Sequence, residues 1–328
     1  MIYLHGLGHF HPENVITNQF LEELDIGTTE EWIMDRVGIV ERRTVMPLDY
    51  IRDTKNADPR ATDRVRLYSD AQMGAAAAKM ALERAGVAAK EIGMVVSSSA
   101  LPEYVTPTQA AQVSCLLGIE VPCFDINVGC SAFGVQMHLL NSLKPEALPA
   151  YVLALSIETV TLNVDFSDRS AAVLFGDAAS AAVVSPTVPS SLVIDHTGMS
   201  SKPSLWEKVL VPRWTHFRQD GNAVQGFAIR KTAELLRHLK TQLADAGVGR
   251  LLFVGHQVNL GALRTVCELI GIPEENHWHN VEYFGNVSSA GAPSVLSQCW
   301  DDLKAGDVVA VAVVGAGLGW AQLSLSRK

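Results

Sequence analysis

The chain has 328 residues, of which 48% are hydrophobic and 19% charged, and its formal net charge is −9. This size and composition predict a globular protein with a large core, built as one large domain or two packed halves. The acidic balance, without a basic block, argues against nucleic acid or an anionic membrane as the main partner. The opening "MIYLHGLGHF" lacks the pattern of a signal peptide, and no run of about 18 apolar residues occurs, so we expect a cytoplasmic protein.

Helical patterns and apolar runs alternate in the first half of the chain. Helices are expected at 70–86, 106–118 and 131–144, and strands at 91–100, 123–128, 150–158 and 178–185. This βαβα order predicts a largely parallel sheet covered by helices.

The second half repeats the plan. Helices are expected at 227–247, 260–271 and 289–303, a strand at 250–258, and a strand, glycine turn and strand within 307–325. Both halves end in paired apolar strands, which predicts a pseudo-duplicated α/β protein with one sheet per half, divided into 1–185 and 186–328. Residues 186–226 contain four prolines and no clear period, and are the expected connector.

The five cysteines are odd in number and widely spaced, which argues against a disulfide framework. Four of them are typical of small buried hydrophobic residues: Cys115, Cys123, Cys267 and Cys299. Cys130 differs, because "FDINVGCSAFGV" places it at a sharp turn from a strand into a helix.

At such a turn, unpaired N–H groups and the helix dipole would stabilise a thiolate on Cys130. Gly129 would supply a backbone conformation that a Cβ atom obstructs. The pattern predicts a nucleophile, although many buried structural cysteines occupy similar turns.

Two further loops offer polar side chains at strand ends. "FVGHQVN" places His256 directly after an apolar strand, and "YFGNVSSAGAP" places Asn286 after a glycine and before a small-residue helix. Both would border the crevice where α/β proteins bind ligands. Taken singly, His256 is also compatible with a hydrogen-bonded core histidine, and Asn286 with a turn residue.

Taken together, these three segments resemble the Cys, His and Asn motifs of the β-ketoacyl-ACP synthase III family in the thiolase superfamily. The resemblance extends over "GLGHFHPENVITNQFLEEL", "TTEEWIMDRVGIVERR", "DRSAAVLFGDAASAAVV" and the closing "GAGLGW". It implies a five-layered αβαβα thiolase fold, a homodimer, and a pocket reached through a tunnel for phosphopantetheine arms.

The resemblance also implies roles for individual residues. Cys130 would carry an acyl group taken from acyl-CoA or an acyl carrier protein. Its N–H and that of Ala316 would form the oxyanion hole. His256 and Asn286 would stabilise the enolate left when a malonyl-type donor loses CO2, and neither a metal nor a tightly bound cofactor is required.

Four more residues are implied as contacts to coenzyme A or phosphopantetheine: Trp32, Arg36, Arg169 and Asn259. A Trp face and guanidinium planes suit an adenine ring and its phosphates. The alternative for Trp32 is a half-buried side chain packed beside surface arginines.

The sequence departs from the family in two loops, which favours a member from a specialised pathway. Gly261 stands where the family has an arginine that helps to dock acyl carrier protein. In the family, the loop at 100–109 reaches across the dimer, and a bulky Phe closes the partner's acyl pocket. Thr106 stands at that place here, so a longer or branched chain could fit. Glu103 lies three residues before the position where chain-joining relatives have a base, and is either a pocket residue or a solvated carboxylate.

Several related activities are less compatible with these motifs. Thiolases need a second Cys in the last glycine turn, and elongating synthases need a second His. Hydroxymethylglutaryl-CoA synthases use a Glu, for which Glu103 is the sole nearby candidate, and the flanking motifs of plant-type polyketide synthases are not evident. The alternatives that stay open are an α-pyrone-type enzyme joining two acyl chains, an acyltransferase to an oxygen or nitrogen acceptor, and a non-catalytic partner subunit.

Overall fold

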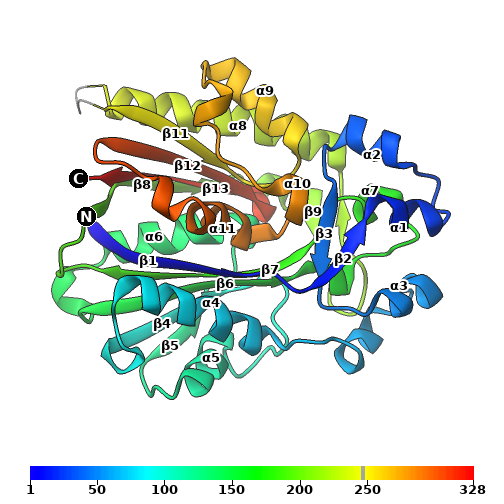
Figure 1. Ribbon diagram of the computed structural model, residues 1–328, viewed down its shortest axis with the longest axis horizontal. Helices are drawn as coiled ribbons and strands as arrows, with labels where there is room; N and C mark the ends of the chain where they lie inside the picture. The colour runs from blue at the N-terminus through cyan, green and yellow to red at the C-terminus, as the bar shows by residue number, and fades with distance from the viewer. Residues whose placement is uncertain (245–247) are drawn as a thin grey trace.

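The structure is a computed structural model that describes residues 1–244 and 248–328. Figure 1 shows two sheet layers alternating with three helical layers. One outer layer holds α8 (Gly221–Gln242) and α9 (Leu260–Ile270), the middle layer α6 (Ala132–Ser142) and α11 (Gly291–Gln298), and the other outer layer α4 (Asp70–Ala85) and α5 (Gln109–Leu117). The predicted αβαβα arrangement is therefore confirmed.

The strands of both layers belong to one nine-stranded sheet, in the order β11-β12-β13-β8-β1-β7-β6-β4-β5. Their bounds are β1 Ile2–Phe10, β4 Ile92–Ser98, β5 Cys123–Asp125, β6 Tyr151–Thr159, β7 Asp177–Ser185, β8 Leu192–Ser201, β11 Arg250–Gly255, β12 Asp307–Gly315 and β13 Gly319–Arg327. The prediction of one separate sheet per half is wrong, because β1 pairs with β8 through Ile2–Leu4 and Leu192–Ile194.

The prediction of a largely parallel sheet is also wrong. Only β4/β5, β4/β6 and β11/β12 are parallel pairs within this sheet. The other five pairs are antiparallel: β1/β7, β1/β8, β6/β7, β8/β13 and β12/β13. The unpredicted strands β1 and β8 account for three of these five pairs, because each pairs antiparallel with both of its neighbours. The other two, β6/β7 and β12/β13, join predicted strands that run in opposite directions.

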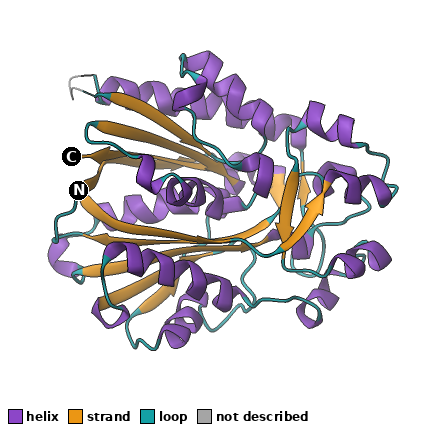
Figure 2. Ribbon diagram, viewed as in Figure 1, coloured by secondary structure: helices purple, strands orange, loops and turns teal. Residues whose placement is uncertain are grey.

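The expected connector at 186–226 contains β8 and the short pair β9 (Val209–Leu210) and β10 (Arg218–Gln219). Helix α8 begins at Gly221 rather than at 227, because Asp220 caps it by accepting from the Ala223 N–H. The predicted end of this helix, at 245–247, lies outside the described residues. Figure 2 shows the small strand pairs apart from the main sheet.

The remaining elements surround one end of the main sheet (Figure 1). They are β2 (Asn14–Thr17), β3 (Glu41–Thr44), α1 (Asn18–Glu23), α2 (Glu30–Arg36), α3 (Leu48–Thr54), α7 (Arg169–Ala172) and α10 (Val281–Phe284). Within the described ranges, no helix combines the length and apolar character needed to cross a bilayer.

Local sequence signals set the ends of the predicted helices. Helix α4 begins with a capping box in which the Ser69 and Gln72 side chains each bond the other's backbone N–H, and it ends at Gly86 with φ +63°. Helices α5 and α9 end in the same way at glycines with positive φ. These caps explain why the bounds of α4, α5 and α9 agree closely with the sequence pattern.

Candidate active site

A cavity of about 450 Å³ opens between the two halves of the chain. Its walls include Cys130, His256 and Asn286, which come from the β5–α6 turn, the end of β11 and the loop after α10. The structure therefore brings together three residues that are far apart in the sequence. Ala316, from the turn between β12 and β13, lines the same cavity.

A tight 3-10 turn, Gly129–Ser131, presents Cys130 to the cavity just before α6 begins. Gly129 has φ +56°, a conformation that favours glycine, so the sequence prediction for this position is confirmed. A Cβ atom on Gly129 would lie 3.2 Å from the Ala316 nitrogen. The turn therefore packs directly on the backbone of the β12–β13 turn.

Gly315, at the end of β12, is the second glycine at this contact and lies against the backbone of the Cys130 turn. A Cβ atom there would lie 2.8 Å from the Cys130 nitrogen and 2.7 Å from the Ser131 nitrogen, closer than side chains tolerate. Only glycine allows the two turns to meet in this way. The backbones of Cys130 and Ala316, the predicted oxyanion-hole donors, are thus held next to one another.

The thiol of Cys130 differs from the sequence prediction. Burial raises its pKa to about 11, and the negative charge of Glu158 acts in the same direction, against a hydrogen bond from Ser288 that lowers it. The expected stabilised thiolate at the helix N-terminus is therefore wrong for this structure, because loss of solvation outweighs the local donors. At neutral pH, Cys130 is a thiol that must lose a proton when it attacks.

His256 is neutral at physiological pH, because burial lowers the pKa of its imidazole to about 4. Its Nδ1 atom is buried and has no hydrogen-bond partner among the described residues. This geometry does not match a hydrogen-bonded core histidine, the alternative that the sequence left open. A neutral imidazole can both accept a proton and donate a hydrogen bond.

Asn286 is buried and fixed on both its backbone and its side chain. Its N–H donates to the Leu174 carbonyl at 2.8 Å, and its Oδ1 accepts from the Ser288 N–H at 3.0 Å. Because the Oδ1 atom is engaged, the NH2 group is the part of the amide that can serve a ligand in the cavity.

A buried carboxylate next to Cys130 was not predicted. Glu158, at the end of β6, accepts from Ser288 Oγ at 3.1 Å, and Ser288 Oγ also bonds Cys130 Sγ at 3.4 Å. Glu158 further accepts from the Ser289 hydroxyl and, at 3.0 Å, from the Ala100 N–H. Burial raises the pKa of Glu158 to about 7. The signal in the sequence was a charge that closes the apolar run "YVLALSIE".

The residues expected to bind the nucleotide end gather at one side of the cavity. Trp32, Arg36 and Asn259 line it, whereas Arg169 does not. Arg169 instead lies over the Trp32 ring, with 4.7 Å from its Cζ atom to the ring centroid, and donates to the Gly27 carbonyl. Asn259 also caps α9 by accepting from the Ala262 N–H at 2.7 Å, so part of its amide has a structural role.

Thr106 and Glu103 do not line this chain's cavity, and their predicted place in the substrate pocket of a partner subunit stays a prediction. Thr106 is exposed. The Glu103 carboxylate pairs with Arg66 at 2.5 Å, and its N–H donates to Asp70 at 3.0 Å. These contacts hold the loop against the start of α4. A pocket role for Thr106 or Glu103 therefore needs a second copy of the chain.

Two sequence models of one family match the chain. The model of 3-oxoacyl-[acyl-carrier-protein] synthase III matches residues 124–203, and the model of its C-terminal part matches residues 250–326. The first match contains Cys130, and the second contains His256, Asn286 and Ala316.

Full-length relatives agree with these matches. The chain is 32% identical to β-ketoacyl-[acyl-carrier-protein] synthase III of Syntrophomonas wolfei, over 98% of this chain and 96% of that protein. The crystal structure of 3-oxoacyl-[acyl-carrier-protein] synthase III from Aquifex aeolicus has a TM-score of 0.86 at 28% identity, covering 99% of this chain and all of that one. The priming β-ketosynthase of the R1128 polyketide pathway has a TM-score of 0.84 at 27% identity, covering 99% and 96%. The chain therefore belongs to the 3-oxoacyl-[acyl-carrier-protein] synthase III family of condensing acyltransferases.

Proposed function

We propose that Cys130 takes the acyl group from an acyl thioester and that the acyl-enzyme then condenses with a malonyl-type donor. The observation that carries the proposal is the convergence of Cys130, His256 and Asn286 on one cavity beside the Ala316 backbone. In the first step the sulfur attacks the acyl carbonyl, a new thioester forms, and the donor leaves as a free thiol. The proton of Cys130 passes to the neutral His256 and from there to the leaving sulfur.

In the second step the malonyl-type thioester loses CO2, and its electrons pass into an enolate. The His256 N–H and the Asn286 NH2 donate to the enolate oxygen. The enolate carbon then attacks the acyl carbon, and the bond from that carbon to the Cys130 sulfur breaks. The N–H groups of Cys130 and Ala316 hold the oxyanion of the tetrahedral intermediate, because donors fixed in advance stabilise charge as it develops.

We further propose that the acyl donor arrives on coenzyme A and the malonyl-type donor on acyl carrier protein. The Trp32 ring, with Arg36 and Arg169 beside it, suits an adenine base and its phosphates. Acyl carrier protein is part of the names of the relatives. Because Gly261 lacks the family's arginine, we expect carrier binding to be weak and to strengthen in Gly261→Arg, with Gly261→Ala as the control.

We propose a homodimer that forms through the edge strand β5. Several large apolar side chains are exposed near this edge: Tyr104, Val105, Leu116 and Phe124. Such a dimer would bring the loop with Thr106 to the partner's cavity. Light scattering on a sizing column should give twice the chain mass, and Val105→Asp with Phe124→Asp should give a monomer.

The alternative that joins two acyl chains needs a carboxylate base, for which Glu103 is the candidate in the sequence. The carboxylate of Glu103 is held by Arg66. Transfer to an oxygen or nitrogen acceptor differs from condensation in one product, since only condensation releases CO2.

The proposed function is tested by incubating the protein with short, medium, long and β-keto acyl thioesters and measuring its intact mass. A mass gain that is absent in Cys130→Ala would establish the acyl-enzyme and identify the preferred chain. Malonyl thioesters on coenzyme A and on carrier protein are then added, and CO2 release is measured. Acylation without CO2 release would favour simple acyl transfer, and no acylation by any thioester would contradict the proposal.

A further inference from the structure

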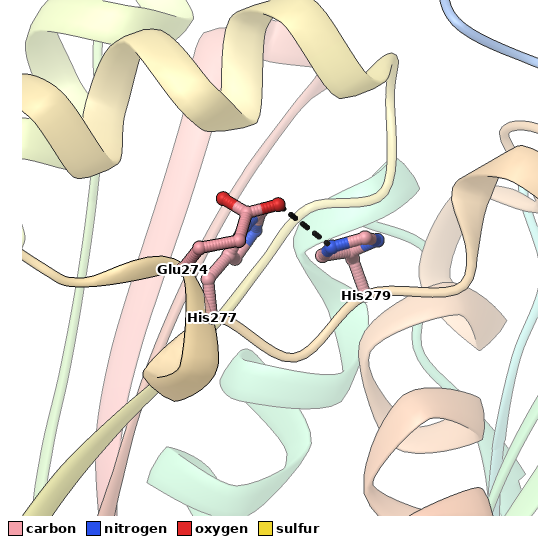
Figure 3. A group of neighbouring side chains, drawn as sticks. All are labelled: Glu274, His277 and His279. Atoms are coloured by element: carbon pink, nitrogen blue, oxygen red, sulfur yellow. Dashed lines mark ion pairs between the residues drawn. The ribbon is translucent and has the colours of Figure 1, made fainter.

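A cluster of two histidines and a glutamate lies outside the active-site cavity, in the segment between α9 and α10. Glu274, His277 and His279 bring one potential ligand atom each to within 4.8 Å of the others. Figure 3 shows the three side chains converging from one short turn. Their spacing, Glu-x-x-His-x-His, allows this because a 3-10 turn at Glu274–Asn276 folds the segment back, with the His277 N–H donating to the Glu274 carbonyl at 3.0 Å.

His277 is the unusual member of the cluster. Only 4% of its surface is exposed, and neither Nδ1 nor Nε2 has a hydrogen-bond partner among the described residues. Its ring stacks on Phe253, with 5.5 Å between the ring centroids, and lies 4.4 Å from the His279 ring at a tilt of 41°. A buried polar atom without a partner costs about 1–3 kcal/mol. The unpaired nitrogens of His277 therefore indicate a binding partner that is not a protein atom.

His279 is oriented as metal-binding histidines are. Its Nδ1 atom lies 2.7 Å from the Glu282 carboxylate, which can only accept, so in the neutral imidazole Nδ1 carries the hydrogen and Nε2 offers a lone pair. The Nε2 atom lies 3.8 Å from Glu274 Oε1, on the side where the cluster converges. A carboxylate behind a ligating histidine fixes its tautomer and strengthens it as a ligand.

One cation already lies at the edge of the cluster. Arg264 contacts Glu274 Oε1 at 3.3 Å, but both side chains are more than half exposed and free to separate. In a tetrahedral Zn²⁺ site with bonds of about 2.0–2.2 Å the ligand atoms lie about 3.4 Å apart. Atoms within 4.8 Å of one another must therefore approach by at most about 1.4 Å, which the exposed Glu274 can provide by rotation.

We propose that Glu274, His277 and His279 form a binding site for a divalent transition-metal ion of the Zn²⁺ type. Two imidazoles and one carboxylate suit such an ion, whereas Mg²⁺ and Ca²⁺ prefer oxygen ligands alone. The site fixes the segment that leads into α10 and on to Asn286. The Trp278 N–H bonds the Phe253 carbonyl at 2.9 Å, so the ion would hold this segment against β11.

The test uses the full chain without a histidine tag, stripped with a chelator and titrated with Co²⁺, whose visible absorption reports nitrogen coordination. We expect one Co²⁺ per chain, displaced by Zn²⁺ and not by Mg²⁺, together with a higher melting temperature when Zn²⁺ is present. Glu274 and His279 are more exposed than His277, so their substitution should disturb the fold least. Glu274→Gln and His279→Gln should each weaken binding at least about tenfold, and Glu282→Gln about tenfold.

Two further variants separate the site from general surface binding. His238→Gln changes an exposed histidine on α8 and should leave the affinity unchanged. Arg264→Gln removes the nearby positive charge and should tighten binding severalfold. Binding that is absent, or that persists unchanged in both Glu274→Gln and His279→Gln, would overturn the proposal. Because the readouts are absorption and melting temperature, the result does not depend on the proposed condensation activity.

Discussion

Replacing Glu158 with glutamine tests how this buried carboxylate controls the Cys130 thiol. The Ser288 hydroxyl lies between them, 3.1 Å from Glu158 Oε1 and 3.4 Å from Cys130 Sγ. A hydroxyl has one hydrogen to donate, and an ionised carboxylate attracts it more strongly than a thiol does. We therefore expect ionised Glu158 to oppose formation of the Cys130 thiolate, both by its charge and by engaging the Ser288 hydrogen.

The size of the charge effect follows from the geometry. The two bonds to Ser288 place the sulfur and the carboxylate oxygen no more than about 6.5 Å apart, where two unit charges interact by about 2–3 kcal/mol at an effective dielectric constant of about 20. This energy corresponds to roughly 30- to 160-fold in the thiolate population. Because burial raises the pKa of Glu158 to about 7, the effect should exist above neutral pH and vanish below it.

The assay is alkylation of Cys130 by iodoacetamide, followed by peptide mass from pH 5.5 to 9. The ratio of the Glu158→Gln rate to the wild-type rate should be near one at acid pH. It should rise through neutral pH to about 30–160. Glu146→Gln, which changes an exposed carboxylate, should give a ratio near one throughout, and Cys130→Ala identifies the signal.

Two results would refute this reasoning. A slower rate for Glu158→Gln at alkaline pH would mean that Glu158 accepts the thiol proton through Ser288, in place of His256. A ratio that does not change with pH would mean that Glu158 does not titrate near neutrality in the folded protein.

Three other changes test separate parts of the structure. Gly315→Ala should slow acylation about 100-fold, because its Cβ would displace the Cys130 N–H from the oxyanion hole; single-turnover mass spectrometry measures the rate, and an unchanged rate would contradict this geometry. Asn286→Ala should abolish CO2 release yet retain acylation of Cys130, and normal condensation would exclude its proposed role. Burial raises the pKa of Asp177 to about 6, above the 3.8 of an unperturbed Asp, so the folded state holds this proton more tightly than the unfolded state. The free energy of unfolding should therefore fall by about 3 kcal/mol as the pH rises from about 4 to about 6. Urea unfolding of Asp177→Asn should lack that decline, and an identical pH dependence in both proteins would contradict the assignment.

Local signals in the sequence marked the three residues that meet in the cavity, but the family resemblance was needed to group them, because His256 and Asn286 taken singly are also compatible with structural roles. Cys130, His256 and Asn286 stand at the end of an apolar run or beside a glycine that turns the chain. Glu158 also closes an apolar run, but nothing in the sequence distinguishes it from an ordinary charge at a strand end. Its partner Ser288 is 130 residues away, so the contact depends on the tertiary fold alone. The raised pKa of the Cys130 thiol escaped prediction for the same reason, since burial comes from the whole structure.

The fold was predictable where the period of the pattern was clear. The capping residues of α4 and α9 mark the ends of these helices in the sequence. The continuous apolar runs of β6 and β12 mark these two strands as buried. Strand β8 was missed because only its first three residues are buried and its last three are exposed. Strand β1 was missed because glycines and histidines interrupt it, although it pairs with strands from both halves.

The pairing of β1 with β8 also bears on the division of the chain at residue 186. That boundary stays a prediction, but the sheet and the cavity both contain residues from each side of it. Residues Ile2–Leu4 of the first half pair with Leu192–Ile194 of the second, and the Cys130 turn packs on the β12–β13 turn. A fragment ending at residue 185 would contain the nucleophile but lack Ala316, His256 and Asn286. The cavity and its chemistry can therefore form only after both halves have folded against each other.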